Sequence, residues 1–255
     1  MSSTRPRDWD AATYHRVSDI QFDWGLEVLD RLPLAGDETV LDAGCGSGRL
    51  SAVLEERLEH GRLIAVDGSP SMVERARETL GRGVRVQLAD LAELELGEAV
   101  DAVFSNAVFH WIADHDRLFE RLAAALRPGG RLIAQCGGQG NLDGFHHTLD
   151  AVAQTPPFDD ALSGWEGPWN FASAEATSER LLRAGFEEVE CWLERRPVSP
   201  AEPEAFLAAV CLGPHLERLP ARRRSGFVER VASAAAPLTL DYVRLNIDAR
   251  RVSAR

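Results

Sequence analysis

Residues 39–48 read Thr-Val-Leu-Asp-Ala-Gly-Cys-Gly-Ser-Gly, a short apolar run followed by three alternating glycines. Glycine lacks the side chain that would keep a ligand away from the backbone. Apolar residues at helical spacing follow this turn, at Leu50, Val53, Leu54 and Leu58. A strand, a glycine-rich turn and a helix N-terminus together predict a pocket for a nucleotide-like ligand.

The spacing of the glycines narrows the class of ligand. A dinucleotide-binding turn has the pattern G-x-G-x-x-G, but here Gly44 and Gly46 are followed by Gly48, one position early, and then by Arg49. This mismatch disfavours a nicotinamide-dependent oxidoreductase. The pattern of a phosphate-binding loop, G-x-x-x-x-G-K-[ST], does not occur either. The turn therefore suits a nucleoside ligand without phosphate groups.

Polar residues follow the next three predicted strands, which cover residues 62–66, 84–88 and 99–104. Asp67 ends the second strand, where an acidic residue can accept hydrogen bonds from both hydroxyls of a ribose. Asp90, beside Leu91, can accept a hydrogen bond from an adenine amino group. The end of the fourth strand is followed by Asn106, Ala107, His110 and Trp111. Three strand ends with polar residues in this order indicate a nucleoside-binding site more specifically than the glycines alone do.

A second helix is predicted directly after Asp67 and Gly68. Either Ser69 or Ser71 can act as its N-cap, because a serine side chain accepts hydrogen bonds from the first backbone N–H groups of a helix. Met72 follows, a flexible apolar residue that can pack against a purine.

With these motifs, residues 36–137 resemble the core of a class I S-adenosylmethionine (SAM) methyltransferase. The matching runs are residues 40–48, 65–69, 89–91 and 126–132, the last read as a helix stop and turn before a fifth strand. A more specific similarity, to the trans-aconitate methyltransferase group, rests on residues 9–14 (WDAATY), 106–111 (NAVFHW) and 184–186 (AGF). The malonyl-carrier-protein methyltransferases of biotin synthesis share an element like residues 106–111. Residues 198–237 match no run of these families.

The resemblance implies an α/β, Rossmann-like fold: a seven-stranded, mostly parallel sheet with an antiparallel last strand, helices on both faces and a helical lid. It also implies SAM as the cofactor, with Trp9 and Tyr14 on an N-terminal helix that closes over it. Asp42 is expected to orient backbone amides of the turn. The expected cofactor-binding residues are Trp9, Tyr14, Asp42, Gly44, Cys45, Gly46, Gly48, Asp67, Gly68, Ser69, Met72, Asp90, Leu91, Asn106 and Ala107.

The chemistry of methyl transfer indicates a class of acceptor. Transfer from a sulfonium is an in-line displacement, in which the protein mainly aligns the two reactants. A carboxylate is ionised at neutral pH and needs no general base, whereas an alcohol or an amine profits from one. Because no convincing base is recognised, an acidic acceptor is favoured, and the resemblance implies the carboxylate of a small organic acid such as trans-aconitate. A natural-product acid or a carrier-protein-bound acid is the alternative.

His110 is the candidate to contact the acceptor, either as a base or as a hydrogen-bonding residue that positions it. Trp111, Trp165 and Trp169 are expected to bind the substrate as walls of its pocket. His110 also lies near Asp114, His115 and Asp116, but no second cluster completes a metal-ligand set, so no metal is predicted. The pair His146-His147 is assigned no role.

Composition limits the partners and the compartment. The 255 residues carry a formal net charge of −12, which disfavours binding to nucleic acid. Four cysteines without C-x-x-C spacing suit reduced thiols in the cytoplasm, and neither a signal peptide nor a membrane-spanning run is recognised. We expect a cytoplasmic monomer or homodimer that acts on a small molecule. A non-catalytic SAM-binding module is the alternative from another class.

The chain is expected to form a single methyltransferase domain over residues 1–255. Residues 36–137 would bind the cofactor. Residues 138–238 would form a loop-rich and helical substrate lid that includes a late strand at 186–193, although its helices could instead simply cover an edge of the sheet. Residues 239–250 would form the last strand. In that strand Val243, Leu245 and Ile247 alternate with Arg244, Asn246 and Asp248, which predicts one solvent-facing side.

Overall fold

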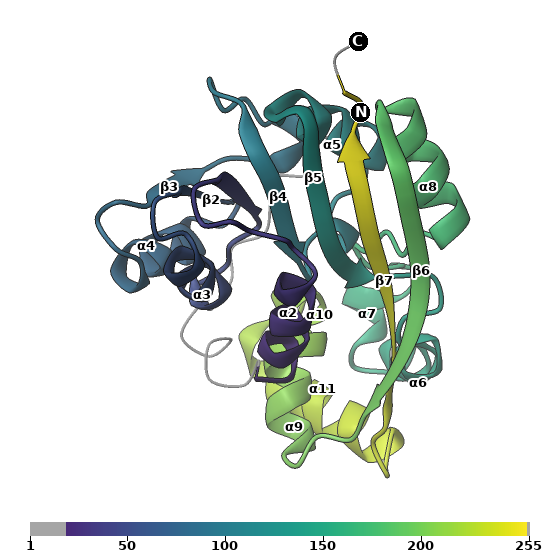
Figure 1. The fold of residues 1–255 in the computed structure, drawn as a ribbon. Coiled ribbons are helices and arrows are strands. Elements are labelled where there is room, and N and C mark those ends of the chain that lie inside the picture. Colours follow the sequence, from purple (N-terminus) through teal and green to yellow (C-terminus); the bar gives the residue numbers. More distant parts are fainter. Residues whose placement is uncertain (1–18, 254–255) are drawn as a thin grey trace.

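The computed structural model describes residues 19–253, so the predicted site residues Trp9 and Tyr14 lie outside the described part. A seven-stranded sheet with the order β3-β2-β1-β4-β5-β7-β6 forms its centre (Figure 1). Only β7 runs antiparallel to its neighbours, as expected for this fold. The strands are β1 (Thr39–Ala43), β2 (Arg62–Asp67), β3 (Arg85–Leu88), β4 (Val100–Asn106), β5 (Leu126–Gly137), β6 (Phe186–Val198) and β7 (Leu240–Arg251).

Helices cover both faces of the sheet. One face packs against α2 (Asp19–Asp30), α3 (Arg49–Arg57) and α4 (Pro70–Thr79), and the other against α5 (His115–Ala125) and α8 (Ala174–Arg183). In β1, Val40 belongs to the apolar cluster under α2 and α3, whereas Leu41 belongs to the cluster that contains α5 residues. The residues of β1 are mostly apolar because both sides of the strand are buried, which is typical of parallel sheets.

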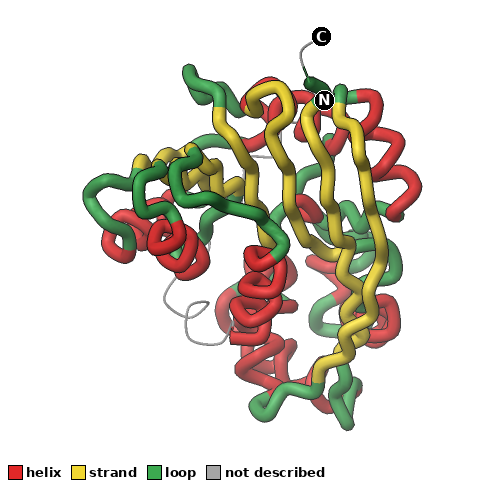
Figure 2. The backbone as a smooth tube through the Cα atoms, in the orientation of Figure 1, coloured by secondary structure: helices red, strands yellow, loops and turns green. Residues whose placement is uncertain are grey.

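A further group of helices has its own apolar core at one end of the sheet. Phe158, Leu207 and Phe227 pack there with Leu240 of β7, and Figures 1 and 2 show β6 and β7 extending into this group. None of the helices in residues 19–253 has both the length and the apolar composition to cross a membrane. The group consists of α6 (Asp143–Ala153), α7 (Asp159–Leu162), α9 (Pro203–Phe206), the π-helix η3 (Leu207–Cys211), α10 (Gly213–Arg218) and α11 (Ala221–Ala234).

Residues 137–170 are more regular than predicted. They contain α6 and α7 rather than a mainly irregular loop. In α6, Phe145, Leu149 and Val152 recur at helical spacing and are buried. Glycines and prolines flank this short periodic run and are more typical of loops.

The strands at the antiparallel end of the sheet also differ from the prediction. β6 continues to Val198 instead of ending at residue 193, and β5 already begins at Leu126, within the segment predicted as a turn. The side of β7 that was predicted to face solvent is buried, since Arg244 and Asn246 are only 3% and 2% exposed. The cause is α2, because its Trp24 packs edge-on against Tyr242 of β7, with ring centroids 5.3 Å apart.

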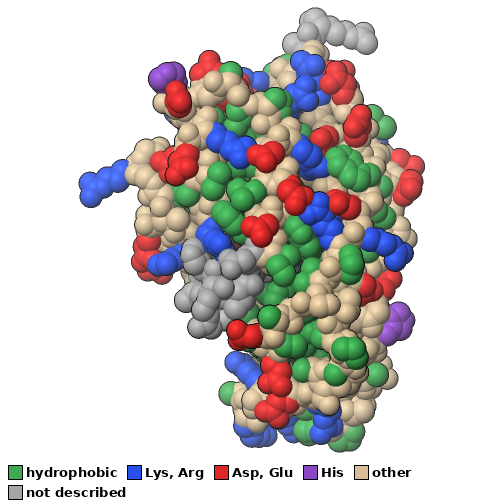
Figure 3. Space-filling view, turned by 60° about the horizontal axis from the view of Figure 1, so that its bottom comes forward, with side chains coloured by type: hydrophobic (Ala, Val, Ile, Leu, Met, Phe, Trp, Pro, Cys, Tyr) green, Lys and Arg blue, Asp and Glu red, His purple; other side chains and the backbone are tan. Residues whose placement is uncertain are grey.

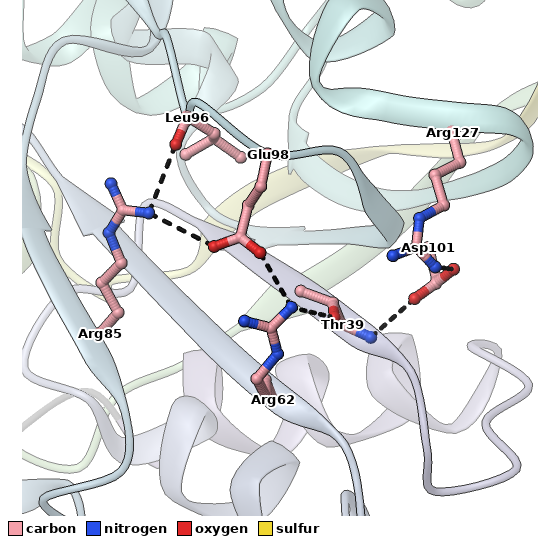
Figure 4. A network of polar contacts seen from close by, with 7 residues as sticks. All are labelled: Thr39, Arg62, Arg85, Leu96, Glu98, Asp101 and Arg127. Atoms are coloured by element: carbon pink, nitrogen blue, oxygen red, sulfur yellow. Dashed lines mark hydrogen bonds and ion pairs between the residues drawn. The ribbon is translucent and has the colours of Figure 1, made fainter.

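Polar contacts connect the amino ends of the parallel strands (Figure 4). Glu98 pairs with Arg62 at 2.8 Å and with Arg85 at 3.5 Å, and Asp101 accepts a hydrogen bond from the backbone N–H of Thr39 at 2.8 Å. Exposed ion pairs each contribute at most about 1 kcal/mol to stability. These contacts tie the strand starts together, far from the strand ends that carry the predicted site.

Candidate active site

A single cleft of about 1600 Å³ collects most of the predicted site residues at the carboxyl ends of the parallel strands. Open α/β sheets bind ligands at this edge. Pockets for one small ligand measure roughly 300–1,000 Å³, so this cleft has room for a cofactor and an acceptor together. Of the predicted residues, those lining the cleft are Asp42, Gly44, Cys45, Gly46, Asp67, Gly68, Ser69, Met72, Asp90, Leu91, Asn106, Ala107, His110, Trp111, Trp165 and Trp169.

Asp67 holds the glycine-rich turn against the start of α4. One of its carboxylate oxygens accepts a hydrogen bond from the backbone N–H of Gly46 at 2.9 Å, and the other accepts one from the N–H of Ser69 at 2.8 Å. A carboxylate has about four acceptor positions. Asp67 therefore has the capacity to fix the turn and also to accept hydrogen bonds from ribose hydroxyls.

Each of the three glycines of the turn is required for a different structural reason. Gly44 has a φ of +92°, and a Cβ there would lie 2.1 Å from a methyl group of Val108. Gly46 has a φ of +53°, and no described atom lies within 4 Å of its ideal Cβ position, so its backbone is open to the cleft. The position of Gly48 differs from the prediction that it binds the cofactor. Gly48 does not line the cleft but caps α3, where a Cβ would lie 3.3 Å from Ala76.

Asp42 has a different partner from the one predicted. Its buried carboxyl accepts a hydrogen bond from the hydroxyl of Ser51 at 2.6 Å, and no bond to a backbone amide of the turn is seen in the described residues. Burial raises the pKa of Asp42 to about 7, and the charge of Asp67 acts in the same direction. Asp42 therefore links β1 to α3.

The cofactor end of the cleft also presents two buried acceptor atoms. Within residues 19–253, neither Oε1 of Gln21 nor Oδ1 of Asn106 has a hydrogen-bond partner. The two residues lie together, because the side-chain N–H of Asn106 donates to the backbone carbonyl of Gln21 at 3.1 Å. Buried acceptors without partners are costly and suit a ligand that brings a donor. The amino group of the methionine part of SAM is such a donor, so the residues present fit this cofactor.

The residues expected around the adenine also have local structural partners. The carboxylate of Asp90 accepts a hydrogen bond from the N–H of Ala92 at 2.9 Å and caps the short helix η1 (Leu91–Glu93). Ser69 caps α4 by accepting a bond from the N–H of Met72 at 3.3 Å. Ser69 is thus the N-cap, out of the two serines considered. The buried side chains of Leu91 and Met72 line the cleft between these caps.

His110 is positioned to donate a hydrogen bond and not to accept a proton. It lies on the short helix η2 (Phe109–Trp111) and is buried, and its Nδ1 accepts the backbone N–H of Gly137 at 3.2 Å. Burial, followed by the nearby charge of Arg244, holds the pKa of His110 well below its usual range. The ring is therefore neutral at pH 7, with its proton on Nε2. The base alternative for His110 is disfavoured.

The neighbouring residues 114–116 start a helix, as predicted. Asp114 caps α5 by accepting a bond from the N–H of Arg117 at 2.9 Å, and Nε2 of His115 lies 2.9 Å from the carbonyl oxygen of Phe109. Among the described residues, no three His, Cys, Asp or Glu side chains are grouped so that they could hold a metal ion.

Stacked rings form one side of the cleft. Phe171 lies parallel to Trp169, with centroids 6.1 Å apart, and near-parallel to His110 at 5.8 Å. His146, to which the sequence assigned no role, stacks on Trp169 at 4.8 Å and lines the cleft. Behind this layer, Trp165 meets His215 edge-on at 4.8 Å. These rings give the cleft a wall made largely of aromatic side chains.

The cleft residues that were missed from the sequence include Asn141, Tyr242 and Arg244. Arg244 and Tyr242 lie at the start of β7, and because this strand is antiparallel, its start meets the carboxyl ends of the others. An arginine alternating with apolar residues usually marks a solvent-facing side. Only the position of α2 reveals that this side is covered.

Comparisons with known proteins agree with this geometry. Residues 41–134 match a family model described as a methyltransferase domain. The chain is 33% identical to a trans-aconitate 2-methyltransferase of Paracidovorax citrulli, over 93% of this chain and 94% of that protein. One from Methylobacterium radiotolerans gives the same identity and coverage. The chain belongs to the trans-aconitate 2-methyltransferase family.

Solved structures show the same fold. The YcgJ protein of Bacillus subtilis matches with a TM-score of 0.62 at 15% identity, over 91% of this chain and 99% of that one. Phosphoethanolamine N-methyltransferase 2 of Haemonchus contortus, solved with SAM, matches with a TM-score of 0.61 at 21% identity, over 96% of this chain and 57% of that one. This member of the trans-aconitate 2-methyltransferase family is a SAM-dependent methyltransferase with the Rossmann-like fold.

Proposed function

We propose that the enzyme transfers the methyl group of SAM to one carboxylate of a small organic acid, with trans-aconitate as the first candidate. The observation that carries this proposal is the similarity to trans-aconitate 2-methyltransferases over 94% of their length. The cleft supports it, since a neutral His110 and a buried Arg244 line it together. Both side chains can donate hydrogen bonds to an anionic acceptor.

We propose the following division of the cleft. The backbone of Gly44 and Gly46 lies along the methionine part of SAM, and Asp67 accepts the ribose hydroxyls. Asp90 accepts the adenine amino group, with Leu91 and Met72 against the ring. SAM supplies a methyl group on a positively charged sulfur, which leaves as a neutral thioether. Trp9 and Tyr14 stay predictions for the same cofactor.

The acceptor needs orientation more than activation. A carboxylate of a small acid is ionised at pH 7, so no proton has to be removed before it attacks. His110 would hold the acceptor by its Nε2–H, and the stacked rings would exclude water and keep a planar acid in place. Alignment of two reactants in this way lowers a barrier by roughly 7–11 kcal/mol.

We also propose that residues 138–238 form the lid over the acceptor, since Trp165, Trp169 and Cys211 from this segment line the cleft. The remaining assignments are a cytoplasmic location and a monomer or homodimer, without nucleic acid. Supporting observations are the net charge of −12 and four cysteines that form no disulfide. On the face shown in Figure 3, basic and acidic side chains are interspersed around hydrophobic ones.

The proposal is tested with methyl-labelled SAM and a panel of acceptors. The panel contains trans-aconitate, other small acids, a carrier-protein-bound acid, an alcohol and an amine. We expect label in trans-aconitate that alkali releases as methanol, as for a methyl ester. Transfer only to the alcohol or the amine would contradict the acid acceptor. Binding of S-adenosylhomocysteine with no transfer to any compound would favour a non-catalytic SAM-binding module.

A further inference from the structure

Four polar residues form a continuous hydrogen-bonded chain on the α2 side of β5 and β7. We call them the polar ladder: Arg31, Asn246, Gln135 and Arg244. Oδ1 of Asn246 accepts bonds from Nη1 of Arg31 at 3.0 Å and from Nε2 of Gln135 at 2.9 Å. Oε1 of Gln135 in turn accepts a bond from Nε of Arg244 at 3.2 Å. The ladder thus connects Arg31 to the Arg244 guanidinium.

Stability alone does not explain the polar ladder. Gln135, Asn246 and Arg244 are each at most 3% exposed. A buried charge is costly, and well-packed apolar residues in its place are often neutral or stabilising. Arg244 also lines the cleft, so a bound acceptor can contact it.

The ladder fixes the plane of the Arg244 guanidinium. Its Nε is held by Gln135, and its Cζ lies 5.4 Å from the ring centroid of Trp24, within the range of a cation–π contact. A guanidinium with a fixed plane presents its N–H groups in a fork that matches a carboxylate. Gln135 and Asn246 are therefore positioning residues.

Arg244 lies at the acceptor end of the cleft. It pairs in the sheet with Gly137, the residue whose N–H binds His110. β7 lies three strands away from β1, the strand that precedes the glycine-rich turn. This separation corresponds to about 14 Å. The strand ends that carry Asp67 and Asp90 are farther still, on β2 and β3. Arg244 is thus on the His110 side and remote from the nucleoside residues.

We propose that Arg244, aimed by Gln135 and Asn246, binds a second carboxylate of the acceptor, one that is not methylated. This inference rests on the proposed function, because it requires an acid as the acceptor. A guanidinium on the reacting carboxylate would withdraw charge from the attacking oxygen. Binding a remote carboxylate instead orients the acid equally in the ground and transition states, which affects KM more than kcat. The enzyme would therefore select acids with at least two carboxylates.

The test compares Arg244→Met, Arg244→Lys and Gln135→Glu with the wild type, with Arg250→Met as a matched control. Arg250 lies near the far end of β7 and binds the backbone carbonyl of Gly129 at 3.1 Å. Calorimetry measures binding of S-adenosylhomocysteine alone and of trans-aconitate to the protein saturated with it. Kinetics give KM and kcat for trans-aconitate and for trans-crotonate, a monocarboxylate.

We expect Arg244→Met to weaken trans-aconitate binding and raise its KM about 10- to 100-fold, with a smaller effect for Arg244→Lys. kcat/KM for trans-crotonate, S-adenosylhomocysteine affinity and the Arg250→Met variant should stay within about twofold of the wild type. Gln135→Glu keeps an acceptor for Nε of Arg244 but adds a negative charge beside it. This variant should weaken trans-aconitate binding as well, whereas a merely structural role predicts near wild-type binding.

Two results would overturn the inference. One is an unchanged KM and affinity for trans-aconitate in Arg244→Met. The other is a loss of S-adenosylhomocysteine binding in that variant while it stays folded by circular dichroism, because Arg244 would then belong to the cofactor. Failure of the proposed function looks different, since the wild type itself would then transfer no methyl group to any acid.

Discussion

At the scale of single residues, the chemistry of the cleft depends on which atoms are already engaged. Asp67 uses part of its acceptor capacity to hold Gly46 and Ser69, and His110 uses its Nδ1 to accept the N–H of Gly137. Asp67 can accept further hydrogen bonds, and His110 can donate one from Nε2.

Replacing Asp67 by asparagine should weaken cofactor binding and leave the fold intact. The amide keeps one acceptor oxygen but loses the charge and the second acceptor. Hydrogen bonds to charged groups contribute about 1.5–3 kcal/mol, so we expect a loss of affinity for S-adenosylhomocysteine of roughly 10- to 150-fold by calorimetry. The exposed Asp37→Asn serves as the control. Equal affinities in both variants would remove Asp67 from the cofactor site.

The pH dependence of the rate separates the two roles considered for His110. Its pKa lies well below the usual value because of burial and then because of the charge of Arg244. Because this pKa is lowered, His110 should add no acidic limb near pH 6.5 to the pH profile of kcat/KM for trans-aconitate. A general base with an ordinary pKa would instead give a tenfold loss per pH unit below about 6.5. Such a limb, absent from His110→Gln, would contradict the donor role.

At the scale of elements, the turn between β1 and α3 combines a packing constraint with an opening toward the ligand. Gly44 lets the turn approach Val108 after β4, whereas Gly46 presents bare backbone to the cleft. The two glycines lie two residues apart, but Gly44 packs against Val108, whereas Gly46 faces the cleft. Their substitutions should therefore separate stability from binding.

Gly46→Ala should fold and lose ligand affinity, whereas Gly44→Ala should lose stability. A left-handed alanine costs about 1–2 kcal/mol, which lowers the Tm of Gly46→Ala by a few degrees, while its methyl group occupies the ligand space. In Gly44→Ala the same strain adds to a contact 2.1 Å from Val108, so its Tm should fall further. Calorimetry with S-adenosylhomocysteine and thermal unfolding measure both effects.

The control for the glycine pair is Gly83→Ala, because Gly83 is exposed and no described atom lies within 4 Å of its ideal Cβ. This variant should match the wild type in affinity and closely in Tm. Wild-type affinity in Gly46→Ala would mean that the ligand does not lie against this part of the turn.

The elements that could be predicted are those with local signals. The turn, the strand end at Asp67 and the cap at Ser69 each follow from neighbouring residues, and all were found in place. Arg244 could not be recognised, since its burial depends on Trp24, more than 200 residues away in the sequence. The α6 run around Leu149 was hidden by flanking glycines and prolines. The sequence therefore could not predict burial by residues distant in the chain, or a short helical run flanked by loop residues.

At the scale of the whole molecule, a parallel sheet supplies the nucleoside residues, and the segment between α7 and α8 supplies most of the aromatic wall, together with His146 of α6. The sheet residues come from β1, β2 and β3, and the helical group has an apolar core of its own. Histidines are also buried in the walls of the cleft.

Stability should fall as the pH drops from about 6.5 toward 4. Burial lowers the pKa of His110, His115 and His146, and that of His215 to about 4. In this window the unfolded chain binds more protons than the folded one, so acid favours unfolding. For His215 the difference from the ordinary 6.5 corresponds to about 3 kcal/mol. Asp42, with a raised pKa, opposes this trend in part.

The contribution of His215 is isolated by His215→Phe, which keeps the ring between Trp165 and Phe227. Urea unfolding at pH 7.5 and pH 5 should show a smaller loss of stability in this variant than in the wild type. The exposed His60→Gln should behave as the wild type does. An identical pH dependence in all three proteins would show that the His215 imidazole titrates normally.

The most direct test is a crystal structure of the enzyme with S-adenosylhomocysteine and trans-aconitate. We predict the ribose hydroxyls at the Asp67 carboxylate, the homocysteine part along Gly44 and Gly46, and the acid between His110 and Arg244 with one carboxylate oxygen facing the sulfur. A nucleoside bound elsewhere, or a cleft that stays empty at saturating concentrations of both compounds, would contradict the assignment of this cleft to methyl transfer.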